Sequence, residues 1–141
     1  MSLNSVNVTA NYDGQNWNFT GDDVSGTDIE VVGPSSVQIT VTASSPNTVA
    51  LPTSGYIQWA NPNRQRNFIR YTTVNTTTSV ISFNDACPEW TYDGEFSFQI
   101  GYYLNGGNQL QYTPDPIIIN KDPDGTMRVT LPKPQLIAAH S

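Results

Sequence analysis

Apolar and polar residues alternate between positions 95 and 112. Four apolar residues occupy every second position of the first half: Phe96, Phe98, Ile100 and Tyr102. This period of two places them on one face of a β-strand, because successive side chains of a strand point to opposite sides. Residues 105–108 (Asn-Gly-Gly-Asn) tolerate positive φ, so the chain can reverse there before Leu110 and Tyr112 resume the alternation. The pattern predicts a β-hairpin, around which the rest of the chain is organised.

Shorter alternating stretches occur along the rest of the chain. In the clearest one, Val37, Ile39 and Val41 share a face. The segment from Arg64 to Thr73 fits either a strand or a single helical turn, and we interpret it as a strand. No segment sustains the helical period of about 3.6 residues. The other alternating stretches contain Val6, Trp17, Ile29, Tyr56, Ile81 and Met127.

These stretches predict an all-β fold of about seven to nine short antiparallel strands, spaced roughly ten residues apart. We expect a single β-sandwich with immunoglobulin-like, Greek-key connections; a small barrel or a jelly roll is the alternative. Pro114 and Pro116 cannot donate to a strand ladder, so the segment around them is expected to lie at a sheet edge or to bend. With 141 residues, the chain is expected to form one domain, residues 1–131, followed by a flexible tail, residues 132–141.

Charge is low and unevenly distributed. Charged residues make up 13% of the chain, against the roughly 25% that is usual for globular domains. The net charge of −6 disfavours nucleic-acid binding, because phosphate backbones would be repelled. Residues 1–63 contain no Lys or Arg, after which Arg64, Arg66 and Arg70 follow one another closely. We interpret these arginines as offsetting the acidic residues that follow them; a dedicated anion site is the alternative.

The sequence carries no targeting or membrane signal. Its first residues have no basic start and no apolar run, so they do not resemble a secretory signal. No segment approaches the ~20 apolar residues that a membrane helix needs. We therefore expect a soluble cytoplasmic protein that does not bind membranes, or an exported one if a leader has been removed.

Two segments resemble parts of known β-sandwich proteins. Residues 93–98 (Asp-Gly-Glu-Phe-Ser-Phe) resemble the entry to the penultimate strand of immunoglobulin-like domains, although Phe96 lacks the hydroxyl of a tyrosine corner and Phe98 stands where many such domains have a cysteine. Residues 113–119 (Thr-Pro-Asp-Pro-Ile-Ile-Ile) are similar to the closing strand of small uncharacterised bacterial sandwich proteins, including the DP-EP group. The resemblance implies a fold and no activity, since that group has no assigned chemistry.

Catalytic groups are scarce in this sequence. The only histidine, His140, lies in the expected tail, where a general base would not be held in place. The only cysteine, Cys87, has no imidazole partner nearby and is interpreted as a small buried apolar residue. Without a second histidine, the ligand set of a blue-copper site is also missing. We therefore expect a protein that is not an enzyme and that uses no cofactor.

Two groups of acidic residues are candidate calcium ligands, because calcium takes oxygen ligands on loops. The first contains Asp22, Asp23 and Asp28, with Glu30 nearby, and the second contains Asp122 and Asp124. Neither group has the spacing of an EF-hand loop. Solvated turn residues are therefore the favoured interpretation, and a calcium-binding loop domain is the third function hypothesis.

Aromatic residues are the remaining candidates for ligand binding. The candidates are Trp17, Trp59, Trp90 and Tyr103. Each tryptophan neighbours Asn, Asp, Glu or Gln in the sequence, and flat rings beside such groups can stack on sugar rings. Alternatively, the tryptophans fill the core or its ends.

Two function hypotheses follow from these observations. The first is a non-catalytic interaction or structural domain that binds an unknown protein partner or itself. The second is a carbohydrate-binding module that uses exposed Trp or Tyr side chains. The two are discriminated by whether an aromatic ring is exposed on a flat sheet face or in a loop cleft: if all three tryptophans are buried, the carbohydrate-binding hypothesis fails and the interaction domain is the default.

Overall fold

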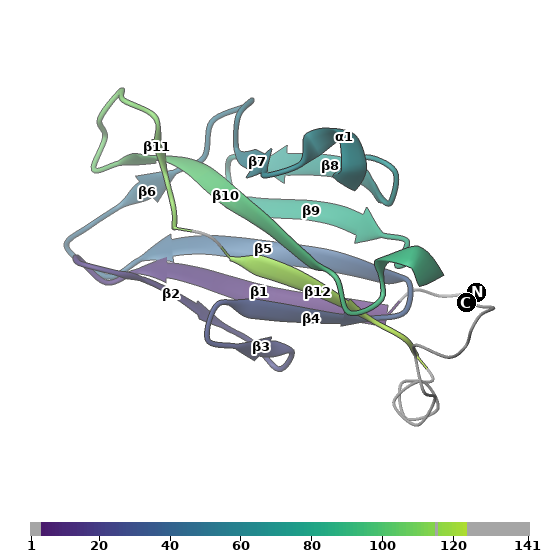
Figure 1. The fold of residues 1–141 in the computed structure, drawn as a ribbon. Helices are drawn as coiled ribbons and strands as arrows, with labels where there is room; N and C mark the ends of the chain where they lie inside the picture. Colours follow the sequence, from purple (N-terminus) through teal and green to yellow (C-terminus); the bar gives the residue numbers. More distant parts are fainter. Residues whose placement is uncertain (1–3, 115, 124–141) are drawn as a thin grey trace.

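A computed structural model describes residues 4–114 and 116–123 of the chain. In this part of the chain, twelve strands form two mixed sheets, with one short α-helix and one 3-10 helix between strands (Figure 1). The α-helix, α1, covers Pro62–Gln65, and the 3-10 helix, η1, covers Glu89–Thr91. The all-β class predicted from the alternating pattern is confirmed.

The first sheet has the strand order β2-β1-β5-β9-β8. Its central strands are long because the apolar and polar residues alternate without interruption, for example at Val37, Ile39 and Val41, which are all buried. The strands of this sheet are β1 (Asn4–Tyr12), β2 (Trp17–Thr20), β5 (Ser35–Ala43), β8 (Ile69–Asn75) and β9 (Val80–Asp85).

The second sheet has the strand order β11-β10-β12-β4-β3, and the short strands β6 and β7 also pair with β10. β10 is the longest strand and pairs along its length with four others, so it holds this sheet together. The strands are β3 (Val24–Ser25), β4 (Asp28–Val32), β6 (Val49–Ala50), β7 (Ile57–Trp59), β10 (Glu95–Leu104), β11 (Gln111–Tyr112) and β12 (Ile117–Lys121).

The predicted hairpin is confirmed by the pairing of β10 with β11. Gly101 faces Tyr112 and Tyr102 faces Gln111 in an antiparallel register. The predicted inward face of β10 is also confirmed, since its four alternating apolar side chains are all buried: Phe96, Phe98, Ile100 and Tyr102. The return strand, β11, is shorter than the alternation from Leu110 to Tyr112 indicated, since it contains only Gln111 and Tyr112. Pro114, two residues further on, has no N–H to donate to a strand ladder.

One core lies between the two sheets. Buried side chains of β1, β5 and β9 form a single cluster with those of β4, β10 and β12. Trp59 of the second sheet contacts Phe83 of the first, with ring centroids 5.6 Å apart. The expected domain boundary at residue 131 and the tail, residues 132–141, lie outside the described residues.

The prediction that all strands pair in antiparallel fashion is wrong. β1 runs parallel to β5 over nine residue pairs, and β12 runs parallel to β4 over five. A period of two reports which face of a strand is buried, and it carries no information about the direction of the neighbouring strand. The strand count of seven to nine is also too low for the described residues, because two-residue pairings leave no periodic signal.

Two local predictions have mixed outcomes. The segment from Arg64 to Thr73 was assigned to a strand, but its first residues belong to α1, and the strand β8 begins only at Ile69. Pro62 at the first turn of α1 explains this, because its fixed φ suits the start of a helix. Pro114 and Pro116 lie between β11 and β12 and belong to neither strand, and the expected bend at this point stays a prediction. Met127, in the last predicted strand, lies outside the described residues.

Candidate functional site

Two of the three tryptophans pack against the core. Trp17 lies against Tyr102, with ring centroids 4.8 Å apart, and its Nε1 atom is buried without a hydrogen-bond partner. Trp59 lies 4.9 Å from Phe98. Both side chains are partly buried, and Tyr103 on β10 is also partly buried. These three rings are less exposed than Trp90, and their use as platforms for a sugar stays a prediction.

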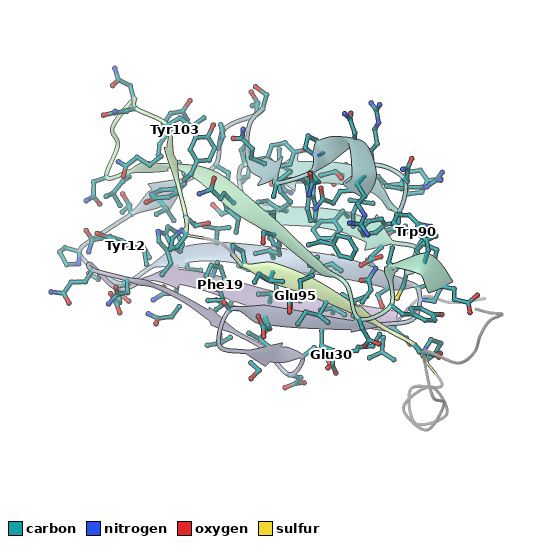
Figure 2. The ribbon with its side chains drawn as sticks, viewed as in Figure 1. Tyr12, Phe19, Glu30, Trp90, Glu95 and Tyr103 are labelled. Atoms are coloured by element: carbon teal, nitrogen blue, oxygen red, sulfur yellow. The ribbon has the colours of Figure 1, made fainter. Side chains whose placement is uncertain are left out.

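Trp90 differs from the other tryptophans. Its side chain is 51% exposed, and it lies on η1 immediately before the N-terminal end of β10. Figure 2 places Trp90 and Tyr103 towards opposite ends of the molecule, in agreement with their positions before and near the end of β10. Of the aromatic residues named from the sequence, Trp90 is therefore the one available to a partner.

The indole ring of Trp90 contacts two side chains, the ring of Phe68 and the guanidinium group of Arg64. The buried ring of Phe68 meets it edge to face, with centroids 5.6 Å apart, and Phe68 also packs 4.7 Å from Phe96. The guanidinium carbon of Arg64 lies 5.7 Å from the centre of the Trp90 ring and 5.3 Å from that of Phe96. Both distances are within the range of a cation–π interaction, and this attraction stabilises the position of the Arg64 guanidinium over the two rings.

Local hydrogen bonds fix the two helices that carry Arg64 and Trp90. In α1, the buried side chain of Gln65 accepts a hydrogen bond from the backbone N–H of Asn61 at 2.9 Å. In η1, the Thr91 hydroxyl donates to the Pro88 carbonyl oxygen at 2.6 Å. An exposed ring that is fixed by its neighbours loses little conformational entropy on binding.

Three exposed arginines accompany Trp90. Arg66 follows Arg64 at the end of α1, and Arg70 lies near the start of β8. Across residues 4–114 and 116–123, Lys121 and Asp93 form the one ion pair, at 3.2 Å, so none of the arginines is paired within this range. The expectation that they offset the following acidic residues across a surface stays a prediction. We call Arg64, Arg66, Arg70 and Trp90, with the supporting rings of Phe68 and Phe96, the Trp90 surface.

A hollow of about 230 Å³ adjoins this surface. Tyr71, on its rim, is 77% exposed and has a positive φ of 58°, at the point where the pairing of β8 with β9 shifts register. Sequence reasoning missed Tyr71, because the shift that turns its side chain outward leaves no periodic signal. The hollow is lined by Pro34, Arg70, Tyr71, Asn84, Asp85 and Ala86.

A buried polar cluster lies beneath the Trp90 surface and links the two sheets. The Asp85 carboxylate, on β9, accepts hydrogen bonds at Oδ1 from the Cys87 backbone N–H (2.8 Å) and from Asn120 Nδ2 on β12 (3.2 Å). Asn120 Nδ2 also donates to the Thr91 hydroxyl at 2.9 Å. The side-chain oxygens Asp85 Oδ2 and Asn120 Oδ1 are buried without a partner. Sequence reasoning missed this cluster, since its members come from three separate segments.

Burial changes the ionisation of two groups in this cluster. Loss of hydration raises the pKa of the Asp85 carboxyl to about 6, against the opposing effect of its two hydrogen bonds. Burial, followed by the nearby Asp85 charge, raises the pKa of the Cys87 thiol to about 11. A thiol of this kind is a poor nucleophile at neutral pH, in keeping with its interpretation as a buried apolar residue.

The structure brings some of the candidate calcium ligands close together. Asp23 and Glu30 line one hollow of about 280 Å³, whereas Asp22 is exposed and Asp28 is partly buried. Among the described residues, no group of three or more His, Cys, Asp or Glu side chains is arranged to hold a metal ion. Asp124 and His140 lie outside those residues.

Comparison of the chain with protein-family models and with curated proteins gives no match. Within the described residues, no helix is long and apolar enough to span a membrane.

Proposed function

We propose that this protein is a non-catalytic interaction domain that binds a protein partner through the Trp90 surface. The observation that carries the proposal is the half-exposed indole of Trp90, which is fixed between Phe68 and Arg64. Trp, Tyr and Arg are the residue types most enriched among the hot spots of protein interfaces. All three types occur together here, since Tyr71 lies beside Arg70 on the adjoining hollow.

Binding of an oligosaccharide is the second candidate function. The exposed indole favours it, because aromatic rings bind sugars by stacking. The position of Arg64 argues against it, since the guanidinium lies over the Trp90 ring and a sugar on that face would have to displace it. We therefore place a protein partner, or a second copy of this chain, before a sugar.

Within the all-β class, we also propose the more specific assignment, an immunoglobulin-like, Greek-key β-sandwich. Two sheets around one core support a sandwich with immunoglobulin-like connections, and the parallel pairs of β1 with β5 and β4 with β12 are additions to that plan. The similarity to the DP-EP group likewise stays a prediction. A non-catalytic role is supported by the buried thiol of Cys87 with its raised pKa.

A pair of screens tests the proposed function. A displayed random-peptide library and an oligosaccharide array are each exposed to the wild-type protein, to Trp90→Ala and to Tyr112→Ala. Tyr112 is a matched control, because its ring is 41% exposed but lies on β11, which pairs with the far end of β10.

We expect peptides that bind the wild type and Tyr112→Ala, and that bind Trp90→Ala at least about tenfold more weakly. Ligands found only on the sugar array, with the same dependence on Trp90, would replace the protein partner by a carbohydrate. If neither screen gives a ligand that depends on Trp90, the proposed function is wrong.

A further inference from the structure

We infer that the partner segment that binds the Trp90 surface is acidic. This inference rests on the proposed function and adds the chemistry of the partner. The inference depends on the positive charge of the arginines around Trp90, whereas the proposal of a protein partner used only their residue type.

Positive charge in this chain is concentrated at the Trp90 surface. The whole sequence contains six Lys and Arg residues against twelve Asp and Glu residues, and three of the six are Arg64, Arg66 and Arg70. All three lie within four residues of Phe68, the ring that supports Trp90. The three arginines are therefore grouped in the sequence around the ring that supports Trp90, and Arg64 lies over the Trp90 ring itself.

These cations are available to a partner. Arg64, Arg66 and Arg70 are exposed and form no ion pair with residues 4–114 or 116–123. Guanidinium groups bind carboxylates through two parallel hydrogen bonds, and an arginine stacked on an aromatic ring is already oriented for this contact. Arg64 is stacked in this way over Trp90 and Phe96.

Charge complementarity therefore selects the partner. A basic segment would be repelled at close range by the three guanidinium groups, whereas the net charge of −6 on the whole molecule would attract it. An acidic segment with an apolar residue would satisfy both parts of the surface, since its carboxylates would pair with the arginines and its apolar side chain would contact the part of the indole that Arg64 leaves open. Local attraction between the arginines and the carboxylates of the segment would make binding depend on salt concentration.

The residue composition of the peptides selected by the wild-type protein tests this inference. We expect an excess of Asp and Glu over the starting library. For one such peptide, Arg64→Gln, Arg66→Gln and Arg70→Gln should each weaken binding about two- to fivefold at low salt, as expected for exposed ion pairs. The triple variant should bind with little dependence on salt concentration.

The matched control changes the net charge equally without altering the arginines. Gln15→Glu, Gln38→Glu and Gln109→Glu replace three exposed amides by carboxylates, so the triple variant also loses three units of charge. It should keep nearly all of the affinity. Peptides that depend on Trp90 but show no acidic excess would overturn the inference while leaving the proposed function intact. Absence of any Trp90-dependent peptide would overturn both.

A second inference concerns the buried cluster and rests on different atoms. We propose that the buried Asp85 carboxyl group, which contacts Asn120 across the two sheets, is a pH-sensitive element whose ionisation weakens the fold. Asp85 Oδ2 is buried without a donor, so a charge on the carboxylate is left unsatisfied at this oxygen. A proton on the carboxyl group removes that buried charge. Asp85 and Asn120 belong to different sheets, which is why their contact joins the layers.

No described cation neutralises Asp85 directly. The charged and titratable groups on the elements packed around it are Arg70, Tyr71, Cys87, Glu89, Asp93, Lys121 and Asp122, and none of these side chains is among the causes that shift the pKa of Asp85. Lys121 is paired with Asp93, and the Cys87 thiol is neutral at physiological pH. The charged carboxylate is consequently stabilised only by its two hydrogen bonds at Oδ1, which do not outweigh the loss of hydration.

The sign of the pH dependence follows from these contacts. The pKa of Asp85 is about 6 in the folded protein, above its ordinary value of 3.8. Well below pH 3.8 the carboxyl is protonated in both states, and its ionisation costs no stability. Between about pH 4 and pH 6 the unfolded state has released its proton while the folded state keeps it, so stability falls across this range and levels off above pH 6. The unfolding equilibrium constant should therefore increase by roughly fiftyfold between pH 4 and pH 7 from this group.

Comparison with Asp85→Asn isolates this contribution. Asparagine keeps an acceptor at Oδ1 for the Cys87 N–H and Asn120 Nδ2, and it carries no charge at any pH in this range. Urea unfolding between pH 4 and pH 8 should show the wild type losing stability relative to Asp85→Asn as the pH rises, and the carboxyl ¹³C resonance of Asp85 should titrate near pH 6. A ¹³C midpoint at or below pH 4, or an identical pH dependence of the two proteins, would overturn the proposal.

Discussion

The three tryptophans have similar sequence contexts and very different surroundings. Each lies in a short strand or loop beside polar residues, but Trp17 and Trp59 pack on the core and only Trp90 is half-exposed. The difference depends on which distant residue reaches each ring: Tyr102 covers Trp17, whereas Arg64 and Phe68 leave part of Trp90 open. The sequence could name the candidate rings, but their exposure depends on contacts between distant segments.

Thr91 connects the Trp90 surface to the buried cluster. Its hydroxyl accepts from Asn120 Nδ2 and donates to Pro88, so Thr91→Val leaves two buried polar groups with one partner fewer. We expect this change to lower the free energy of unfolding by about 1–3 kcal/mol, the cost of unsatisfied buried groups. Chemical denaturation measures the loss, and Thr91→Ser, which keeps the hydroxyl, should lose clearly less. Equal losses in the two variants would show that the hydroxyl contributes nothing.

Gly101 is required by a close approach of two backbone segments. A Cβ atom at this position would overlap the backbone carbonyl oxygen of Gly55 and crowd the Tyr112 ring. Since a backbone oxygen cannot move aside without shifting its segment, Gly101→Ala should destabilise the protein by more than about 2 kcal/mol. Gly106→Ala is a useful comparison, because a Cβ atom there meets nothing within 4 Å, although its φ of 73° adds some strain. A smaller loss for Gly101→Ala than for Gly106→Ala in thermal denaturation would contradict this explanation.

At the scale of elements, the alternating pattern predicted which face of a strand is buried, but it did not predict which strands pair or in which direction. It identified the inward side of β10 and of β5 because burial of one face is what the period of two records. It did not reveal that β1 lies parallel to β5, since their pairing joins residues 31 positions apart, from Asn4 with Ser35 to Tyr12 with Ala43. The direction of a neighbouring strand is set by the path of the connecting chain.

Ile100 tests the assignment of the inward face of β10. Its side chain is completely buried among residues of both sheets, so Ile100→Asp would place a charge in the core. We expect a loss of several kcal/mol, enough to unfold a domain of ordinary stability. Gln38→Asp on the exposed face of β5 should cost no more than about 1 kcal/mol. Circular dichroism with thermal melting distinguishes them, and a native-like melt for Ile100→Asp would refute the assignment.

At the scale of the whole molecule, the amino-acid composition, with its low content of charged residues, predicted the all-β class. Low Lys and Glu content favoured strands over surface helices, in agreement with the two sheets. The grouping of Arg64, Arg66 and Arg70 was visible in the sequence, but their proximity to an exposed Trp90 was not, because η1 follows them by about twenty residues. The buried contact of Asp85 with Asn120 was likewise hidden, as it joins residues 35 positions apart.

The central claim is that a partner binds at the Trp90 surface, and one NMR titration tests it most directly. An acidic peptide selected by the wild-type protein is added to the ¹⁵N-labelled chain while the indole N–H resonances of the three tryptophans are followed. We predict a saturable shift for Trp90, accompanied by shifts in α1 and η1, with Trp17 and Trp59 unchanged. Shifts confined to Trp17 or to the opposite end around β11, with the Trp90 indole unmoved at saturation, would contradict the account.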